Sequence, residues 1–157
     1  MIDIAAACIE DYEAICRVFS EADDLHREAL PDIFQKPDGP CRPMSWLQSY
    51  LDEKHKQIFV ARREREIVGV LEMEEKSASP FPMFRPRRYA IVHGLSVAAK
   101  ARRMGVGTTL MESAKEWANK RNVESIELSV WAFNQSAIEL YHKLGYQTIR
   151  NTMEIKL

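Results

Sequence analysis

The pattern of apolar and polar residues predicts a strand, two helices and a loop at the start of the chain. Alternation in residues 2–4 is typical of a short strand, and from Asp11 onward apolar residues recur at helical spacing. This helix should end near Pro31, because a proline ring clashes with the preceding helical turn. The proline-rich residues 31–43 then predict a loop, and residues 45–54 predict a second, shorter helix.

The middle of the chain has the pattern of three strands. Residues 57–62 and 67–74 are rich in β-formers and flank the charged segment Arg63-Glu64-Arg65-Glu66, which predicts a hairpin. Residues 76–87 carry prolines and serines and predict a long loop, a feature that is often functional in compact domains. Residues 88–97 predict the next strand.

The last third of the chain alternates helices and strands. Apolar residues from Val106 to Ala118 mark a strongly amphipathic helix, and residues 126–131 predict a strand. Residues 137–144 return to helical spacing before Gly145, a residue typical of helix ends, and residues 146–156 predict a closing strand. This order indicates an α/β (α+β) fold with a largely antiparallel first half and a strand–helix–strand crossover in the second.

Length and charge restrict the class of protein. The 157 residues fit a single domain, residues 1–157, and 22 Lys and Arg against 23 Asp and Glu give a net charge of -1. This balance gives no global attraction to nucleic acid or to an anionic membrane, and no apolar run approaches the ~18–20 residues of a membrane span. The N-terminus lacks the pattern of a signal peptide, so we expect a cytoplasmic protein with no nucleic-acid or membrane partner.

Cysteine spacing gives no indication of a disulfide framework or a metal site. Cys8, Cys16 and Cys41 form no C-x-x-C pair, and with the scattered histidines they form no zinc pattern. We therefore expect reduced thiols and no metal.

Residues 95–108 are the segment that most clearly carries chemistry. Here a predicted strand ends, basic residues follow, and Gly105 and Gly107 open the next helix. The first N–H groups of a helix lack internal partners and lie at its positive end, and glycine allows close approach of an anion. No acidic residue stands in this first turn, which favours a phosphate site over an ordinary glycine turn with solvated arginines.

Two common phosphate-binding motifs do not fit this segment. A dinucleotide-binding fingerprint requires a third glycine where Leu110 stands, and its first glycine should follow the strand at once. The Walker pattern G-x-x-x-x-G-K-S/T is absent.

Two segments together resemble a known family. Arg102-x-x-Gly105-x-Gly107, after Leu95-Ser96-Val97, is similar to the Q/R-x-x-G-x-G/A motif of the GNAT superfamily of acyl-CoA N-acetyltransferases. Residues 134–146 resemble that superfamily's motif N-x-x-A-x-x-L/F-Y-x-K-x-G-F/Y. The resemblance implies a mixed, mostly antiparallel central sheet of about six to seven strands flanked by about four helices.

The resemblance also implies acetyl-CoA as co-substrate. The pantetheine arm would pair with the backbone of the strand that ends at Val97, and the pyrophosphate would rest on the start of the following helix. The residues that the resemblance assigns to acetyl-CoA are Leu95, Ser96, Val97, Arg102, Arg103, Met104, Gly105, Val106, Gly107, Thr108, Asn134, Ala137, Tyr141 and Lys143. For Asn134, simple helix capping is an alternative that is compatible with this role.

Three residues are candidates for catalysis. The resemblance makes Tyr141 the general acid that protonates the leaving thiolate, with core packing as the alternative. Glu72 and His93 project from strands expected to line the cleft, and either is a candidate base for the attacking amine. For each, the alternative is an ordinary structural role.

The acceptor site is the least determined part. Residues 21–28 are acid-rich, so Asp23 is a candidate for binding a cationic amine, and His26 and Phe34 are candidates to line the pocket. The apolar residues 81–84 fit either a substrate lid or a contact in a homodimer.

The resulting hypothesis is an acetyl-CoA-dependent N-acetyltransferase acting on a primary amine of a small-molecule or amino-acid-like acceptor. Two alternatives are acetylation of a protein N-terminus or lysine, and a non-catalytic acyl-CoA sensor.

Overall fold

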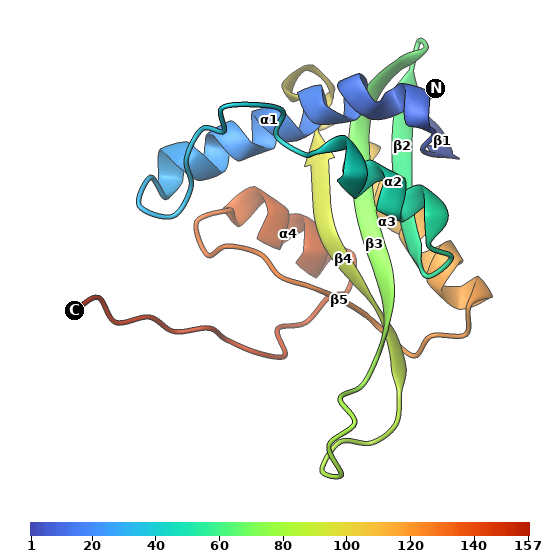
Figure 1. The fold of residues 1–157 in the computed structure, drawn as a ribbon, viewed down its shortest axis with the longest axis vertical. Coiled ribbons are helices and arrows are strands. Elements are labelled where there is room, and N and C mark those ends of the chain that lie inside the picture. The colour runs from blue at the N-terminus through green and yellow to red at the C-terminus, as the bar shows by residue number, and fades with distance from the viewer.

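The computed structural model describes residues 1–157 and contains nine regular elements (Figure 1). In chain order they are β1 (Asp3–Ala6), α1 (Tyr12–Ala29), α2 (Met44–Asp52), β2 (Lys56–Arg63), β3 (Glu66–Ser77), β4 (Arg88–Val97), α3 (Val106–Lys120), β5 (Ile126–Leu128) and α4 (Gln135–Lys143). Short 3₁₀ turns precede α1 and follow β4. This order confirms the predicted class of fold.

The five strands form one sheet in the order β1-β2-β3-β4-β5. All neighbours are antiparallel except β4 and β5, which are parallel and are joined by the crossover through α3. The hairpin between β2 and β3 turns at Glu64 and Arg65, whose φ angles of 52° and 69° are positive, as a two-residue type I′ turn requires. The predicted antiparallel first half and the later crossover are therefore both present.

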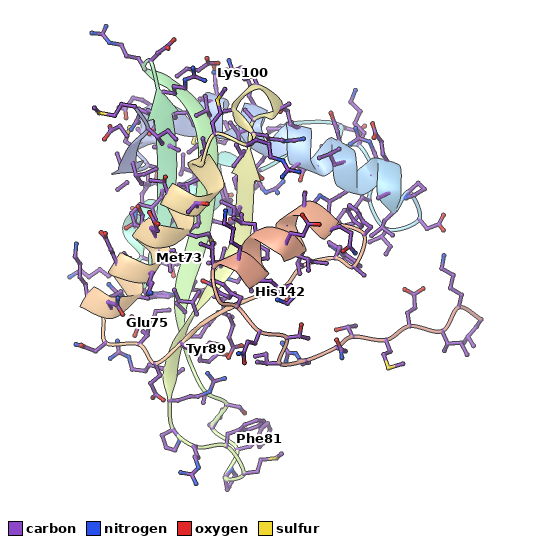
Figure 2. All side chains as sticks on the ribbon, turned by 180° about the vertical axis from the view of Figure 1, so that it is seen from behind. Met73, Glu75, Phe81, Tyr89, Lys100 and His142 are labelled. Atoms are coloured by element: carbon purple, nitrogen blue, oxygen red, sulfur yellow. The ribbon has the colours of Figure 1, made fainter.

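Helices cover both faces of the sheet. Helices α1 and α2 pack on one face, and α3 packs on the other, where α4 also lies (Figures 1 and 2). Side chains alternate along β3, so Gly69 faces Val106 and Leu110 of α3 while Glu72 faces Trp46 of α2. The most deeply buried side chains fill these two layers and include Ile15, Leu47, Leu71, Met73 and Leu110.

The C-terminal prediction is wrong in one respect. Residues 146–156 do not form a strand, and the sheet has five strands rather than six to seven. Residues 147–157, which we call the C-terminal arm, are all exposed and make no backbone–backbone hydrogen bond. A strand exists only beside a neighbouring strand, and the arm has none. For the same reason β5 ends at Leu128 instead of continuing to residue 131.

None of the helices combines the length and the apolar character needed to cross a lipid bilayer.

Candidate active site

The start of α3 has the backbone geometry that the sequence predicts for an anion-binding cradle. Gly105 caps the helix with φ of 82°, and Arg103 precedes it with φ of 63°, so the chain makes a tight left-handed turn here. No acidic residue lies in the first turn of the helix. The backbone N–H groups of residues 103–108 have no hydrogen-bond acceptor within the chain. They are free to bind an anion at the positive end of the helix.

Basic side chains lie around this cradle, and only some of them form ion pairs within the chain. Arg102 and Arg103 are exposed and take part in no ion pair. The Nε–H of Arg102 donates to the Val97 carbonyl oxygen at 3.1 Å, so the side chain lies back over the end of β4. Lys100, by contrast, pairs with Glu66 at 2.5 Å and points away from the cradle (Figure 2). The two arginines are therefore the available positive charges.

Helix α4 packs directly against the cradle. A Cβ atom at Gly107 would lie 3.2 Å from Leu140 and within 4.0 Å of Val97 and Leu95, so close packing of α3, α4 and β4 requires glycine at this position. This contact joins the two segments that the resemblance rests on. It also places Thr108, Ala137 and Lys143 on the elements around the same junction.

Asn134 caps α4. Its side-chain oxygen accepts hydrogen bonds from the backbone N–H of Ala137 and from the hydroxyl of Ser136, both at 3.3 Å. The capping interpretation is thus confirmed, and it fixes the start of α4 beside the cradle.

An irregularity in β4 opens the sheet next to the cradle. Glu72 lies opposite Gly94, but Met73 lies opposite Val92, so His93 is an extra residue that bulges from β4. Pairing with β5 stops at the adjacent pair, Val92 with Leu128. The β4 edge from residue 93 to residue 97 consequently has no strand partner on the β5 side.

Tyr141 lies on α4 in a largely apolar setting. Its ring centroid is 5.9 Å from that of Tyr146, and its hydroxyl makes no hydrogen bond within the chain. Burial, with a smaller contribution from Tyr146, raises the pKa of Tyr141 to about 12. The phenol therefore stays protonated across the physiological range and can act only as a proton donor there.

Glu72 is a buried carboxylate on the opposite face of the sheet, with only 8% of its surface exposed. It accepts a hydrogen bond from the indole N–H of Trp46 at 3.1 Å. A Cβ atom at Gly94 would approach Glu72 Oε1 to 2.8 Å, so the glycine provides the space that the carboxylate occupies. Burial raises the pKa of Glu72, and this is only partly offset by Arg42, His93 and the hydrogen-bonding groups of Trp46 and Tyr50.

His93, the second candidate base, is already engaged. It is exposed, and its Nε2 lies 2.9 Å from Glu74 Oε2, so the ring N–H donates a hydrogen bond to that carboxylate. Glu74 is also held by Lys76 at 2.8 Å. Burial alone would raise the pKa of Glu74, but the bonds from Lys76 and His93 lower it below its ordinary value. The buried Glu72 is the stronger candidate.

Asp23 is not a free carboxylate. It pairs with Arg42 through a contact of 2.9 Å, and the Arg42 guanidinium lies 4.8 Å from the ring centroid of Phe19. The charge that was expected to bind a cationic acceptor is therefore used to hold Arg42. Arg42 in turn lies close enough to Glu72 to lower the pKa of that residue.

His26 and Phe34 belong to an aromatic cluster that also contains Trp131 and Phe133. The His26 ring centroid is 5.4 Å from those of Phe34 and Phe133, and Phe34 is 5.6 Å from Trp131. Nδ1 of His26 lies 2.7 Å from the Ala22 carbonyl, which can only accept, so Nδ1 carries the proton. Nε2 of neutral His26 is then an available acceptor.

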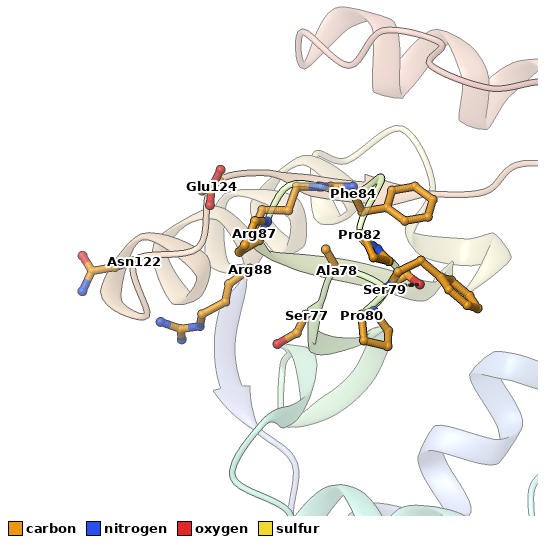
Figure 3. A pocket seen from close by; sticks show the side chains of 12 residues that line it. Ser77, Ala78, Ser79, Pro80, Pro82, Phe84, Arg87, Arg88, Asn122 and Glu124 are labelled. Atoms are coloured by element: carbon orange, nitrogen blue, oxygen red, sulfur yellow. Dashed lines mark hydrogen bonds between the residues drawn. The ribbon is translucent and has the colours of Figure 1, made fainter.

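A separate hollow of about 670 Å³ lies beneath the long loop between β3 and β4 (Figure 3). It is lined by the loop itself together with Arg88, Asn122 and Glu124. The loop residues Phe81, Pro82 and Phe84, considered above as a substrate lid or a dimer contact, line it, but none of the candidate catalytic or acetyl-CoA residues does. The loop carries the exposed side chains of Phe81, which Figure 2 labels at its tip, and Phe84.

Comparison with known proteins identifies the family of the chain. The model of the acetyltransferase (GNAT) family matches residues 21–146, which spans both the acid-rich part of α1 and the cradle. The chain belongs to the GNAT family of acetyltransferases. It is 28% identical over 131 residues to an N-alpha-acetyltransferase of Sulfurisphaera tokodaii, a match that covers 80% of this chain and 72% of that protein.

This GNAT enzyme is also similar to two further proteins. It is 26% identical over 140 residues to the L-amino acid N-acetyltransferase AaaT of Escherichia coli, covering 83% of this chain and 82% of that one. The crystal structure of a variant of the BH1408 protein from Bacillus halodurans superposes with a TM-score of 0.94 at 27% identity, over 99% of both chains. The chain is an N-acetyltransferase, and enzymes of this family use acetyl-CoA.

The residues of this GNAT chain fit acetyl-CoA. Unpartnered N–H groups and two arginines outside any ion pair suit a pyrophosphate, and the open β4 edge beside them suits an extended chain of amides. Sequence reasoning missed Trp46, Tyr50 and Arg42. Trp46 and Tyr50 stand four apart on α2 with ring centroids 5.5 Å apart, a spacing that could have indicated a shared face. Arg42 lies in a loop and gave no signal.

Proposed function

We propose that this GNAT enzyme transfers an acetyl group from acetyl-CoA to the primary amine of a small, amino-acid-like acceptor. The observation that carries the proposal is the buried Glu72 carboxylate beside Gly94, because Gly94 directly precedes the β4 segment that packs on the cradle. An anion cradle and a buried base thus flank one short stretch of strand. Acyl transfer to an amine uses both.

The donor half of the site would be formed by the cradle and the free edge of β4. The N–H groups of residues 103–108 would receive the pyrophosphate, with Arg102 and Arg103 adding positive charge. Leu95 and Val97 would pair with the amides of the pantetheine arm, which requires Arg102 to leave the Val97 carbonyl. Acetyl-CoA bound there supplies the acetyl group as a thioester.

Glu72 is the proposed general base. A lysine-like amine has a pKa of about 10.4 and is protonated at neutral pH, so it must lose a proton before it can attack. The raised pKa of Glu72 suits this transfer better than that of an ordinary surface carboxylate, and the Trp46 N–H holds the carboxylate in place. The proton would move to Glu72 directly or through one water molecule.

Tyr141 is the proposed general acid. When the carbon–sulfur bond breaks, the electron pair stays on sulfur and a thiolate would leave unless it receives a proton. The phenol of Tyr141 is protonated and has no competing hydrogen bond within the chain. It is therefore available to donate that proton.

Arg42 favours an acceptor that carries a carboxylate close to its amine. The guanidinium is partly exposed and acts on Glu72, so a positive group stands beside the proposed base. An amino acid could direct its amine to Glu72 and its carboxylate to Arg42. The amino-acid substrate in the name of the Escherichia coli relative supports the same class.

The test is release of free thiol from acetyl-CoA with a matched set of acceptors. Free amino acids are compared with their carboxamides, with polyamines and with peptides that have a free N-terminus. Loss of a charge-assisted hydrogen bond should lower kcat/KM for the carboxamides by about tenfold or more. A clear preference for peptides would instead indicate protein acetylation, and acetyl-CoA binding without thiol release from any amine would indicate a sensor.

A further inference from the structure

The C-terminal arm has the sequence of a strand but no partner. Its apolar side chains Met153, Ile155 and Leu157 fall on alternate positions and are 92%, 83% and 116% exposed. Ile149, 74% exposed, lies on the same face, with Asn151 between it and Met153. Polar residues occupy the positions between them. With its backbone groups also unpaired, the arm presents one apolar face and two free hydrogen-bonding edges.

The β5 edge of the sheet also lacks a partner strand. Strand β5 is the last strand, and its outer edge pairs with nothing. The chain beyond it leaves Val130, Trp131 and Phe133 37%, 43% and 38% exposed, and α4 contains no fully buried residue. An unpaired, partly apolar strand edge is a template for another strand.

We propose that the arm of one copy pairs with the β5 edge of a second copy, so that two chains exchange their C-terminal strands. The arm leaves the body after Tyr146 and runs outward, away from the sheet of its own chain (Figures 1 and 2). Its only polar side-chain contact with the body is Lys156 with Asp32 at 3.2 Å, between two strongly exposed residues. Eleven extended residues reach about 36–40 Å, which is enough to cross to a second molecule.

One kind of contact, arm against β5, would pair both the unpaired arm and the unpaired outer edge of β5. Each chain gives an arm and receives one, so the interface closes with twofold symmetry and covers the outer edge of both β5 strands. Pairing would also extend β5 beyond Leu128, where the sequence predicts a strand to residue 131. The match to BH1408 covers 99% of both chains, so the alignment extends into the arm.

Mass measurement and hydrogen exchange together test the exchange. The full-length chain, kept under reducing conditions because its three cysteines are free, is examined by light scattering after size exclusion at tens of micromolar. We expect a dimer in which amides of residues 148–156 and 129–131 exchange slowly, and both segments should lose protection together on dilution.

A pair of double variants separates the apolar face from the polar one. Met153→Asp with Ile155→Asp places charges on the apolar face and should weaken dimerisation by about a hundredfold or more. Thr148→Asp with Thr152→Asp adds the same charge to the polar face and should leave the dimer intact. Circular dichroism checks that both variants are folded, since the arm lies outside the core.

Several results would overturn the proposal. These are a monomeric wild-type chain, whether its arm is protected by folding back or not, a dimer with a rapidly exchanging arm, and a dimer that survives the Met153→Asp, Ile155→Asp change.

Discussion

Replacing Glu72 with glutamine should affect activity and stability in opposite directions. Glutamine has the same shape and keeps an oxygen that can accept the Trp46 N–H bond now seen at 3.1 Å. It cannot take a proton from an amine. Removing a general base typically costs about 10²–10⁴-fold in rate, so kcat/KM should fall within that range while acetyl-CoA affinity stays unchanged.

The stability effect follows from the sign of the pKa shift. Because burial raises the pKa of Glu72 in the folded chain, its protonated form stabilises the fold below the unfolded-state pKa of about 4.3, and this contribution is lost as pH rises through the folded-state pKa. At neutral pH the wild type therefore carries an ionised carboxylate that folding disfavours. Relative to Glu72→Gln, the wild type should lose about 1.4 kcal/mol for each unit by which the pKa is raised.

Urea unfolding at acidic and at mildly alkaline pH measures the difference in stability between the wild type and Glu72→Gln. The pH profile of kcat/KM measures the titration of Glu72. The wild-type kcat/KM should rise with pH through the raised pKa, and this limb should be missing in Glu72→Gln. Glu74→Gln, two residues along the same face of β3, is the control and should keep the limb. Unchanged kcat/KM in folded Glu72→Gln, or inactivation accompanied by destabilisation of more than about 2 kcal/mol, would refute the reasoning.

Three other changes probe the rest of the site. Tyr141→Phe should lower kcat by about ten- to a thousandfold and change acetyl-CoA affinity by less than about tenfold; since the pKa is raised to about 12, wild-type kcat should show no alkaline decline up to about pH 10. Gly107→Glu should abolish acetyl-CoA binding in calorimetry, whereas Gly39→Glu, in open space, should not. Asp23→Asn should free Arg42 from its ion pair, so that Arg42 lowers the pKa of Glu72 further and the acidic limb of the kcat/KM profile moves to lower pH.

Periodicity predicted the elements whose position depends on local pattern. The helical spacing after Asp11 gives α1, and the charged turn at residues 63–66 gives the hairpin of β2 and β3. The prediction fails at the C-terminal arm, because alternation states which face of a strand is apolar but says nothing of where its neighbour lies. The same reasoning explains why residues 129–131, expected to continue β5, stay irregular.

The candidate site divides in a similar way. The cradle at Gly105 and Gly107 consists of a turn and the helix start that follows it. Because these residues are neighbours in the chain, the sequence is sufficient to predict the cradle. The surroundings of Glu72 are not local: Trp46 comes from α2 and Arg42 from the preceding loop. Asp23 shows the limit clearly, because its carboxylate was predicted to bind a substrate cation and instead binds Arg42.

A single extra residue in β4 connects the two halves of the site. Val92 shares its face of the sheet with Met73, and Leu95 packs toward Gly107 on that same face, although three positions separate Val92 from Leu95. Regular alternation would put them on opposite faces, so the bulge at His93 is what keeps both on the α3 side. The same bulge ends the pairing with β5 and leaves Gly94 facing Glu72. Removing one residue here should therefore destroy the cradle contact and the space for the base together, while the hairpin of β2 and β3 remains.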